Sequence, residues 1–377
     1  MIPALPPDFG PFQGRTWLNA AHQGPLPRAA RRAIQAATRM KVRPARLPDD
    51  AFWEAPRRLR EALAKLIGAR TESIALTNST TYGINVVAQG FDFRHTADEV
   101  LLVDGDFPAT VLPWLARRDI TVRFLRGTRG RIDPDLLEAN LGPRTRVFCT
   151  NWVFSFYGSA LDLTALAEVC RRRGVLFVVN GSQGVGTREI SVESGIDVLS
   201  ACGFKWLCGP YATGFCWLSE AALERIHYPL PNWLRNQEGG GLSQEMDYQL
   251  PHQHGASAYD VFCTANFLNF MPWTAAIEEL LSLGIAAVAR HNQRLVDLLI
   301  SRLPTGFELL SPAAGPQRST LVFISHRDPG RNQRIMRMLA SARIDVALRE
   351  RNIRVSPHLY NSSTDIEALL QVLASAA

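Results

Sequence analysis

A strand–helix–strand unit in the middle of the chain constrains the fold more than any other feature. The stretches "TRVFCTNWV" (145–153) and "VLFVVN" (175–180) are short and apolar, and "DLTALAEVCRRRG" (162–174) between them has helical periodicity. Asp162 near its start and Gly174 at its end are typical of helix boundaries. Strands that are apolar along their whole length are buried on both faces, and a helix between two strands allows them to pair in parallel. We therefore expect a mainly parallel sheet covered by helices.

The same alternation extends over most of the chain. Further strands are expected at 73–77, 99–105, 120–127, 197–204 and 213–219, and helices at 27–40, 52–68 and 80–91. From about residue 284 a different pattern begins, with helices at 284–303, 332–342 and 364–375 and strands at 319–325, 345–350 and 352–356. The sequence predicts an α/β fold with a large domain over 15–283. A smaller α+β domain over 284–377 is expected to include residues 1–14.

Composition narrows the class of protein. The chain has 377 residues, 46% of them hydrophobic, so it can bury a sizeable core. It has no apolar run of 18 residues and no signal-peptide pattern at its start, so we expect a cytoplasmic protein that does not enter a membrane. Its six cysteines lack zinc-site spacing, which favours structural thiols and no metal. The net charge of +6 comes from arginines spread along the chain, and this distribution does not favour nucleic-acid binding.

One lysine stands out because the chain has only three. Lys205 lies in "CGFKWLCGP", directly after a predicted strand and before a glycine–proline turn. In an open α/β sheet the carboxyl ends of the strands face the ligand crevice. The flanking Phe204 and Trp206 favour partial burial, which lowers the pKa of an amine and prepares it to form a Schiff base. Taken alone, a lysine is more often simply solvated.

Four other stretches suggest what Lys205 would bind. "TNSTTYGIN" places hydroxyl side chains at a helix N-terminus, where free N–H groups favour a phosphate. "GDFPATVLPW" carries Phe107, which can lie flat on a planar ring. "TNWVFSFYG" and "NGSQGVG" end two strands on polar amides, Asn151 and Asn180. A phosphate cradle, a stacking ring, polar groups and a lysine together fit pyridoxal 5′-phosphate.

In this ordered set of motifs the chain resembles the class V aminotransferase-like enzymes, which include isopenicillin-N-epimerase-like proteins and cysteine desulfurases. The likeness extends from "WLNAAHQGPLP" to "NIRVSPHLYNSSTDIEALLQVL". It implies the fold type I architecture of pyridoxal-phosphate enzymes, with a seven-stranded sheet in the large domain. It also implies that Lys205 is the Schiff-base lysine and that Arg354 binds the α-carboxylate of an amino-acid substrate, where a bidentate fork suits the geometry.

The resemblance assigns the remaining site residues as well. The cofactor phosphate is expected to contact Ser79, Thr80 and Thr81, together with Thr264 from a neighbouring subunit, so that a homodimer shares its sites. Phe107 is expected to stack on the cofactor ring, Asn151 to lie near its hydroxyl, Asn180 near its nitrogen and Gln183 near the Schiff base. Alone, Thr80 would more often be an N-cap, Phe107 a core residue and Arg354 a salt-bridged strand residue. For His22, as for His252 and His254, substrate contact and an ordinary loop position are equally favoured.

Three departures from the family pattern concern the cofactor. "CGFK" replaces "SGHK", so Cys202 and Phe204 are poor phosphate donors, and Ser200 or Thr264 would have to compensate. Ala212 stands where relatives have a more flexible glycine. Asn180 replaces the family's aspartate, which predicts a weaker electron sink because a neutral amide does not favour a protonated pyridine nitrogen.

The expected reaction breaks a bond at Cα. Cysteine desulfurases form a persulfide on a cysteine before the carboxylate-binding arginine, but no cysteine follows Cys263 here, so that mechanism is excluded. We favour a lyase-type reaction, either β-elimination from an S-substituted cysteine or decarboxylation or oxidative deamination. Epimerisation and transamination are the alternatives, and a non-catalytic regulator that binds the cofactor or an amino acid is a rival from another class. The irregular stretch 236–255 suggests a bulky substrate, as in lincosamide-like antibiotic pathways, by analogy at fold level.

Overall fold

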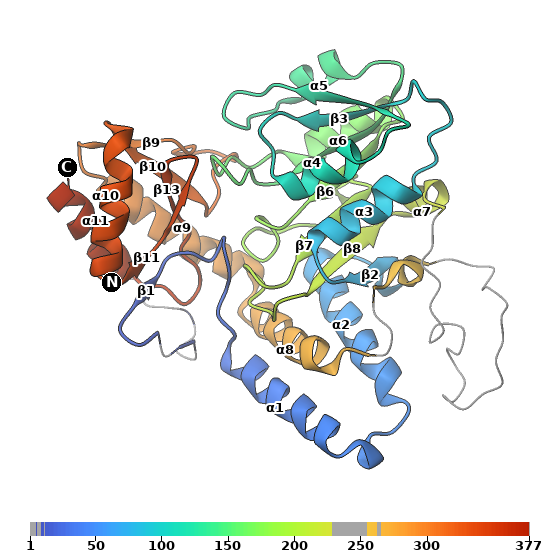
Figure 1. Cartoon of the computed structure of the whole chain (residues 1–377), viewed down its shortest axis with the longest axis horizontal. Coiled ribbons are helices and arrows are strands. Elements are labelled where there is room, and N and C mark those ends of the chain that lie inside the picture. The colour runs from blue at the N-terminus through green and yellow to red at the C-terminus, as the bar shows by residue number, and fades with distance from the viewer. Residues whose placement is uncertain (1–4, 6–8, 11, 228–254, 262–264, 377) are drawn as a thin grey trace.

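The computed structural model of the chain describes residues 5, 9–10, 12–227, 255–261 and 265–376. Its main feature is a seven-stranded sheet, and a four-stranded sheet lies in the C-terminal part of the chain (Figure 1). The large sheet has the spatial order β2 (Ile74–Thr77), β8 (Gly214–Leu218), β7 (Val198–Cys202), β6 (Leu176–Asn180), β5 (Thr145–Asn151), β3 (Glu99–Val103) and β4 (Thr121–Leu125).

Strand direction in the large sheet confirms the predicted α/β class. Strands β4, β3, β5, β6 and β7 pair in parallel, and β8 runs antiparallel between β7 and β2. All residues of β3, β5, β6 and β7 are buried apart from Arg146 in β5. These four strands read as near-continuous apolar runs because helices cover both faces of the sheet.

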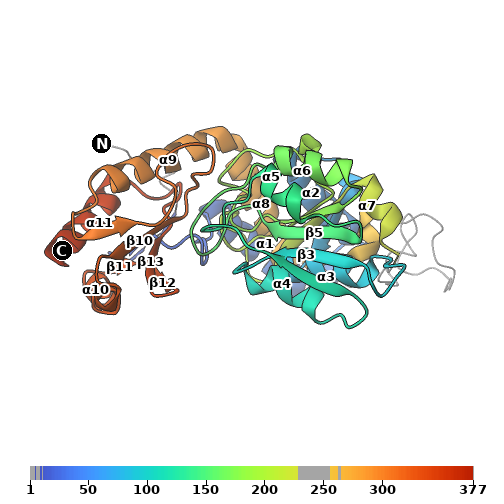
Figure 2. The same ribbon diagram turned by 90° about the horizontal axis from the view of Figure 1, so that it is seen from above.

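Alternate residues of one strand contribute to two separate cores. In β3, Leu101 and Val103 belong to a core that includes residues of α2 (Ala51–Ile67), α6 (Leu163–Arg172) and α8 (Phe267–Leu283). Val100 and Leu102 belong to a second core, with residues of α3 (Thr80–Gly90), α4 (Pro108–Leu115) and α7 (Glu220–Arg225). This division follows from the two-residue period of a strand. Figure 2 shows α2, α6 and α8 on one side of the sheet and α3 and α4 on the other.

Helix α8 is the longest element that the sequence did not predict. Its 17 residues are apolar around most of the helix, and Pro272 lies inside it. It packs against both α1 (Arg28–Val42) and α2, as well as against the large sheet's core, so several of its faces are buried. A helix that is apolar all round has no amphipathic stripe, and the usual periodicity signal is therefore weak. The short helix α4 was missed as well.

The C-terminal part of the chain forms a separate sheet with its own core. Its strands have the order β12 (Ala347–Arg349), β13 (Asn352–Val355), β10 (Val322–His326) and β9 (Phe307–Leu309), all antiparallel. Helices α9 (Ile285–Ser301), α10 (Asn332–Ser341) and α11 (Ser363–Ala376) contribute to that core. In Figure 1 these elements, orange to red, gather on one side of the molecule.

The N-terminal segment joins this C-terminal part. Strand β1 (Thr16–Trp17) pairs in parallel with β11 (Ile344–Asp345), and the next residue, Leu18, lies in the C-terminal core. The domain boundaries expected from the sequence, 15–283 and 284–377, stay a prediction.

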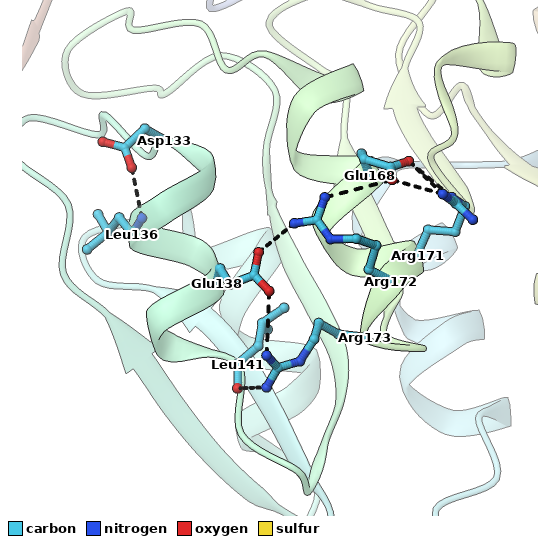
Figure 3. Close-up of polar contacts among 8 residues, drawn as sticks. All are labelled: Asp133, Leu136, Glu138, Leu141, Glu168, Arg171, Arg172 and Arg173. Carbon is cyan, nitrogen blue, oxygen red and sulfur yellow. Dashed lines mark hydrogen bonds and ion pairs between the residues drawn. The ribbon is translucent and has the colours of Figure 1, made fainter.

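The arginines predicted at the end of one helix form ion pairs at the surface. Arg172 of α6 and Arg173, which follows that helix, pair with Glu138 of α5 (Pro134–Asn140), and Arg171 pairs with Glu168 one turn earlier in α6 (Figure 3). All these side chains are at least one-third exposed, so each pair contributes at most about 1 kcal/mol. The two pairs to Glu138 link the end of α6 to α5, whereas the Arg171–Glu168 pair lies within α6.

Short 3-10 turns complete the described elements, namely η1 (Pro44–Arg46), η2 (Thr71–Ser73), η3 (Val192–Ser194), η5 (Ala256–Tyr259) and η6 (Pro329–Arg331). No single helix in the described ranges has the length and apolarity needed to cross a membrane, although α8 and α9, bent by 78° at their junction, meet the criterion as a pair.

Candidate active site

Polar side chains collect where the parallel strands end. Asn151 is the last residue of β5 and lies directly beside Asn180, the last residue of β6. Lys205 follows the end of β7, the next strand in the sheet. Carboxyl ends of neighbouring parallel strands form one edge, which is where ligands bind in open α/β sheets. The structure therefore brings together three residues that the sequence singled out separately.

A hydroxyl that sequence reasoning missed connects the two amides. Thr110 of α4 donates its Oγ1–H to Oδ1 of Asn151 at 2.6 Å and accepts from Nδ2 of Asn180 at 3.0 Å. Asn180 Oδ1 accepts from the backbone N–H of Ser182 at 3.0 Å. The buried Nδ2 of Asn151 has no protein partner. Because buried amides are normally hydrogen-bonded, this free N–H₂ group is a donor that is available to a ligand.

A buried carboxylate, Asp106, holds this edge together and was also missed. Its Oδ1 accepts from the N–H of Phe107 at 2.7 Å, and its Oδ2 accepts from the N–H of Asn151 at 3.0 Å and from the hydroxyl of Thr150 at 3.1 Å. Burial raises the pKa of Asp106 to about 7, although these three hydrogen bonds oppose the shift. The carboxylate thus ties the residue at the start of α4 to the end of β5.

The three hydroxyl residues predicted to contact a phosphate, Ser79, Thr80 and Thr81, lie at the N-terminus of α3. Ser79 is the N-cap and accepts from the N–H of Tyr82 at 3.2 Å, so Ser79, and not Thr80, caps the helix. Thr80 is buried, and its hydroxyl lies 2.6 Å from that of Ser182. Thr81 is exposed. Free backbone N–H groups at such a helix start favour an anion.

Lys205 lies close to two aromatic rings. Its Nζ is 5.6 Å from the ring centre of Phe107 and 5.9 Å from that of Phe204. Phe107 is 37% exposed, so its ring is available for stacking. Burial lowers the pKa of Lys205, Cys202 opposes the shift, and Arg354 and Arg349 add to it. A lowered pKa increases the neutral, nucleophilic fraction of the amine.

The turn that carries Lys205 is fixed from several sides. The N–H of Gly24 donates to the carbonyl of Phe204 at 2.9 Å, and a Cβ at Gly24 would lie 2.1 Å from the carbonyl oxygen of Lys205. Only glycine permits this approach. On the other side, Nε1 of Trp206 donates to Oε1 of Gln183 at 2.8 Å, and the Trp206 carbonyl contacts Nε2 of His358 at 2.9 Å.

Gln183 and Ser200 use their polar atoms within the protein. Nε2 of Gln183 donates to the carbonyl of Ala21 at 3.1 Å, so its amide, predicted to lie near the Schiff base, binds Trp206 and Ala21. The fully buried hydroxyl of Ser200 donates to the carbonyls of Thr80 at 3.1 Å and Phe215 at 3.3 Å. The Ser200 hydroxyl therefore binds the backbone at the start of α3. The sequence had suggested instead that this hydroxyl contacts the cofactor phosphate.

Two arginines of the C-terminal sheet act electrostatically on Lys205. Arg354 in β13 is only 4% exposed, and its Nε and Nη2 have no protein partner. Burial, and then the charge of Arg349, lowers the pKa of Arg354 to about 10. Partial desolvation of its ring also lowers the pKa of His22, although most of that residue is exposed, and the charges of Arg349, Arg354 and Lys205 add to the shift. Arg349 was not singled out from the sequence.

The other predicted positions are placed as follows. Cys202, the last residue of β7, is buried. Ala212 has a φ of 57°, in the left-handed region where relatives' glycine would be unstrained. Thr264, His252, His254 and most of the 236–255 stretch lie outside the described residues. Within the described ranges no group of three or more histidine, cysteine or acidic residues is arranged to hold a metal ion.

Comparison with known proteins identifies the family. The family described as "Aminotransferase class-V" matches residues 46–369. The chain belongs to the aminotransferase class-V family. It is similar to isopenicillin N epimerase of Amycolatopsis lactamdurans, with 30% identity over 95% of this chain and 94% of that protein. It is also similar to a probable cysteine desulfurase of Methanothermobacter thermautotrophicus, with 25% identity over 84% of this chain and 82% of that protein.

Solved structures of this class V fold match over nearly the whole chain. The cystine C–S lyase C-DES, in complex with its reaction product cysteine persulfide, superimposes with a TM-score of 0.85 and 23% identity, covering 96% of this chain and 97% of that one. The apo cysteine desulfurase of Thermococcus onnurineus also gives a TM-score of 0.85, at 19% identity, covering 98% and 96%. These likenesses confirm the fold type I architecture.

The cofactor of the class V enzymes is pyridoxal 5′-phosphate, and the residues present fit it. Nδ2 of Asn151 is a buried donor without a protein partner, which suits the ring hydroxyl. The exposed ring of Phe107 can cover a planar heterocycle, and the Ser79-capped start of α3 suits a phosphate. Nζ of Lys205 lies 5.6 Å from the centre of that ring, so the amine would be beside a cofactor that stacks there.

Proposed function

We propose that this class V enzyme breaks a bond at Cα of an amino-acid substrate, with Lys205 as the Schiff-base lysine and the group that moves the Cα proton. The observation that carries the proposal is the position of Lys205. It follows the end of β7, its Nζ lies 5.6 Å from the Phe107 ring centre, and its pKa is lowered mainly by burial. Pyridoxal phosphate, when bound, withdraws electrons from Cα and so makes its bonds easier to break.

The chain's own residues have distinct tasks in this reaction. Arg354 binds the substrate α-carboxylate, since its Nε and Nη2 are buried and unpaired and form a bidentate fork. Phe107 covers one face of the site, and the Asn151 amide presents a donor at its edge. Lys205 takes or returns the proton at Cα, a task that needs an amine with a pKa closer to neutrality than that of free lysine.

We favour a lyase-type reaction, namely β-elimination from an S-substituted cysteine, or decarboxylation or oxidative deamination. Support comes from the absence of any cysteine after Cys263, which leaves no thiol before Arg354 to carry a persulfide. One of the solved relatives is named as a cystine C–S lyase. Epimerisation is the second candidate because a relative at 30% identity is named isopenicillin N epimerase. Transamination remains an alternative. By the same likeness to isopenicillin N epimerase, we also propose a role in antibiotic biosynthesis.

A homodimer with shared sites is part of the proposal. Thr264 is assigned to the phosphate of the neighbouring subunit by its place in the family motif alone, because it lies outside the described residues. Mixing Lys205→Ala subunits with Thr264→Trp subunits should restore some activity, since one hybrid site would keep both residues. Subunit exchange without any recovery would contradict shared sites.

The proposed function is tested by trapping the lysine. The purified holoprotein should be yellow, should lose that absorbance with borohydride, and should then carry the reduced cofactor on the peptide that contains Lys205. Lys65→Ala is the matched control, because Lys65 lies in α2 and should leave labelling unchanged. Lys205→Ala should remain folded and lose both labelling and turnover.

Two results would contradict the proposal. Borohydride labelling at another lysine would place the Schiff base elsewhere. A protein that binds the cofactor at Lys205 but turns over none of a panel of amino acids, S-substituted cysteines and keto acids would support the regulatory alternative. Product analysis with the same panel separates elimination, decarboxylation, epimerisation and transamination.

A further inference from the structure

The side chains of Arg349 and Arg354 lie on the same face of the four-stranded C-terminal sheet. Antiparallel pairing places Ala347 opposite Arg354, and Arg349 opposite Asn352. Directly opposed residues share a face, and so do residues two apart on one strand. The two arginines are therefore diagonal neighbours at the β12–β13 edge, on the face opposite to Ile353 and Val355, which belong to the C-terminal core.

Neither arginine has an acidic partner among the residues that the structure describes. Nη1 of Arg349, a half-buried residue, donates to the carbonyl of Leu348 at 2.9 Å. Arg354 is 4% exposed and leaves Nε and Nη2 unpaired. Glu350, the next residue along the chain, is exposed and forms no ion pair with Arg349 within this part of the protein. Burying unpaired positive charge is costly, so this pair is prepared for anions that arrive from outside.

The charge of Arg349 acts on three residues of the candidate site. It contributes to the lowering of the pKa of Arg354, of Lys205 and of His22, although burial is the larger cause in each. These effects agree with the β12–β13 register, which sets Arg349 beside Arg354. One α-carboxylate bound by Arg354 would leave the positive charge of Arg349 without a partner.

The turn that presents Arg349 is strained. A two-residue loop joins β12 to β13, and its residues Glu350 and Arg351 have φ values of 45° and 63°. Such a loop favours asparagine and glycine, because other residues are strained in the left-handed region. Strain of this kind persists where a side chain must be held in one place. Here the tight turn ends β12 at Arg349 and fixes its diagonal relation to Arg354.

We propose that the substrate carries a second anionic group, such as a carboxylate, in addition to its α-carboxylate, and that Arg349 binds this group. The inference rests on the proposed function, in which Arg354 takes the α-carboxylate. It narrows the substrate class to amino acids with a negatively charged side chain or substituent. One charged hydrogen-bonded contact changes affinity by about ten- to a hundredfold.

The test compares ligands that differ only in the distal charge. For the holoprotein, binding of S-carboxymethylcysteine and of its amide, S-carbamoylmethylcysteine, is followed by the change in cofactor absorbance. Glutarate and its monoamide are titrated calorimetrically against cofactor-free protein, since these ligands have no amine to react. The dianion should bind about ten- to a hundredfold more tightly in both pairs. Arg349→Gln should bring the ratio close to one.

Two further variants serve as controls. Arg349→Lys keeps the charge and should retain part of the preference, whereas Arg351→Gln alters the exposed arginine of the same turn and should retain all of it. A wild-type ratio near one, or a ratio that survives in Arg349→Gln, would overturn the proposal. It would also be overturned if Arg349→Gln weakened binding of pyridoxal phosphate and left the ratio unchanged, because Arg349 would then bind the cofactor. Since the glutarate titration needs no Schiff base, it remains informative even if Lys205 is not the reactive lysine.

Discussion

The hydroxyl of Thr110 donates a 2.6 Å hydrogen bond to Oδ1 of Asn151, and this contact determines which end of the Asn151 amide faces the site. Thr110 can donate in that direction because its oxygen accepts from Nδ2 of Asn180 at 3.0 Å. The free Nδ2 of Asn151 is the result. Asn180 therefore acts on the edge of the site through Thr110, in addition to any direct contact with the cofactor.

Asn180→Asp should reverse this chain of hydrogen bonds. A carboxylate only accepts hydrogen bonds, so the Thr110 hydroxyl would donate to residue 180. Oδ1 of Asn151 would then lose the hydrogen bond that it accepts from Thr110. The added negative charge should also favour a protonated cofactor nitrogen. We expect a shifted cofactor absorbance and more conversion to the pyridoxamine form per turnover, measured by spectroscopy and product partition. Thr110→Val separates the two effects, because it breaks the chain without adding charge. Identical spectra and partition in Asn180→Asp and wild type would contradict the expectation.

Asp106→Asn should change the pH dependence of stability. The folded-state pKa of Asp106, about 7, lies above its ordinary value of 3.8, so between these values the folded protein holds a proton that the unfolded chain has lost. The free energy of unfolding therefore falls as pH rises through this window, by up to about 1.4 kcal/mol per pH unit. The variant should lack this contribution, as measured by urea unfolding from pH 4 to 8.

The matched control for Asp106 is Asp104→Asn, because Asp104 is exposed and lies in the same loop. It should keep the wild-type pH slope. Asp106→Asn should also weaken cofactor binding, since an amide cannot accept all three hydrogen bonds that position Phe107 and Asn151. A parallel pH slope in Asp106→Asn and wild type would show that the carboxyl group does not titrate in this range.

His358 should make stability depend on pH in the opposite sense to Asp106, and His358→Gln should remove this contribution. Burial lowers the pKa of His358 to about 3, below its ordinary value of 6.5. Between these values the unfolded chain binds the extra proton, so the free energy of unfolding rises with pH and the contribution is lost on acidification. The variant should lose less stability than the wild type between pH 6.5 and 4. Exposed His95 provides the control His95→Gln, which should follow the wild-type curve.

Ala212→Gly should stabilise the protein. Ala212 has a φ of 57°, and glycine adopts this conformation without the steric cost that a Cβ adds. We expect a gain of about 0.5–1 kcal/mol in the free energy of unfolding, after the larger entropy of glycine in the unfolded chain is subtracted. Ala29→Gly in helix α1 should instead destabilise by a similar amount, because its backbone is helical. A loss of stability in Ala212→Gly would contradict the steric explanation.

Several site residues could not be found from the sequence because their roles depend on long-range partners. Asp106 reads as one more acidic residue in a loop, yet its carboxylate accepts hydrogen bonds from Thr150 and Asn151, more than 40 residues away. Arg349 reads as one arginine among 38, and only the β12–β13 register sets it beside Arg354. Gln183 was noticed, but its amide binds Ala21 and Trp206.

The sequence by itself determined the alternation of buried strands and helices, the place of Lys205 after β7, and the polar ends of β5 and β6, because these depend on local periodicity and on turn residues. Tertiary structure alone decided which polar atoms remain free. Asn151 keeps an unpaired Nδ2 and Ser200 does not keep a free hydroxyl, although both lie in parallel strands of the large sheet. Hydrogen bonds between distant segments consume some donors and leave others, and no local pattern encodes that outcome.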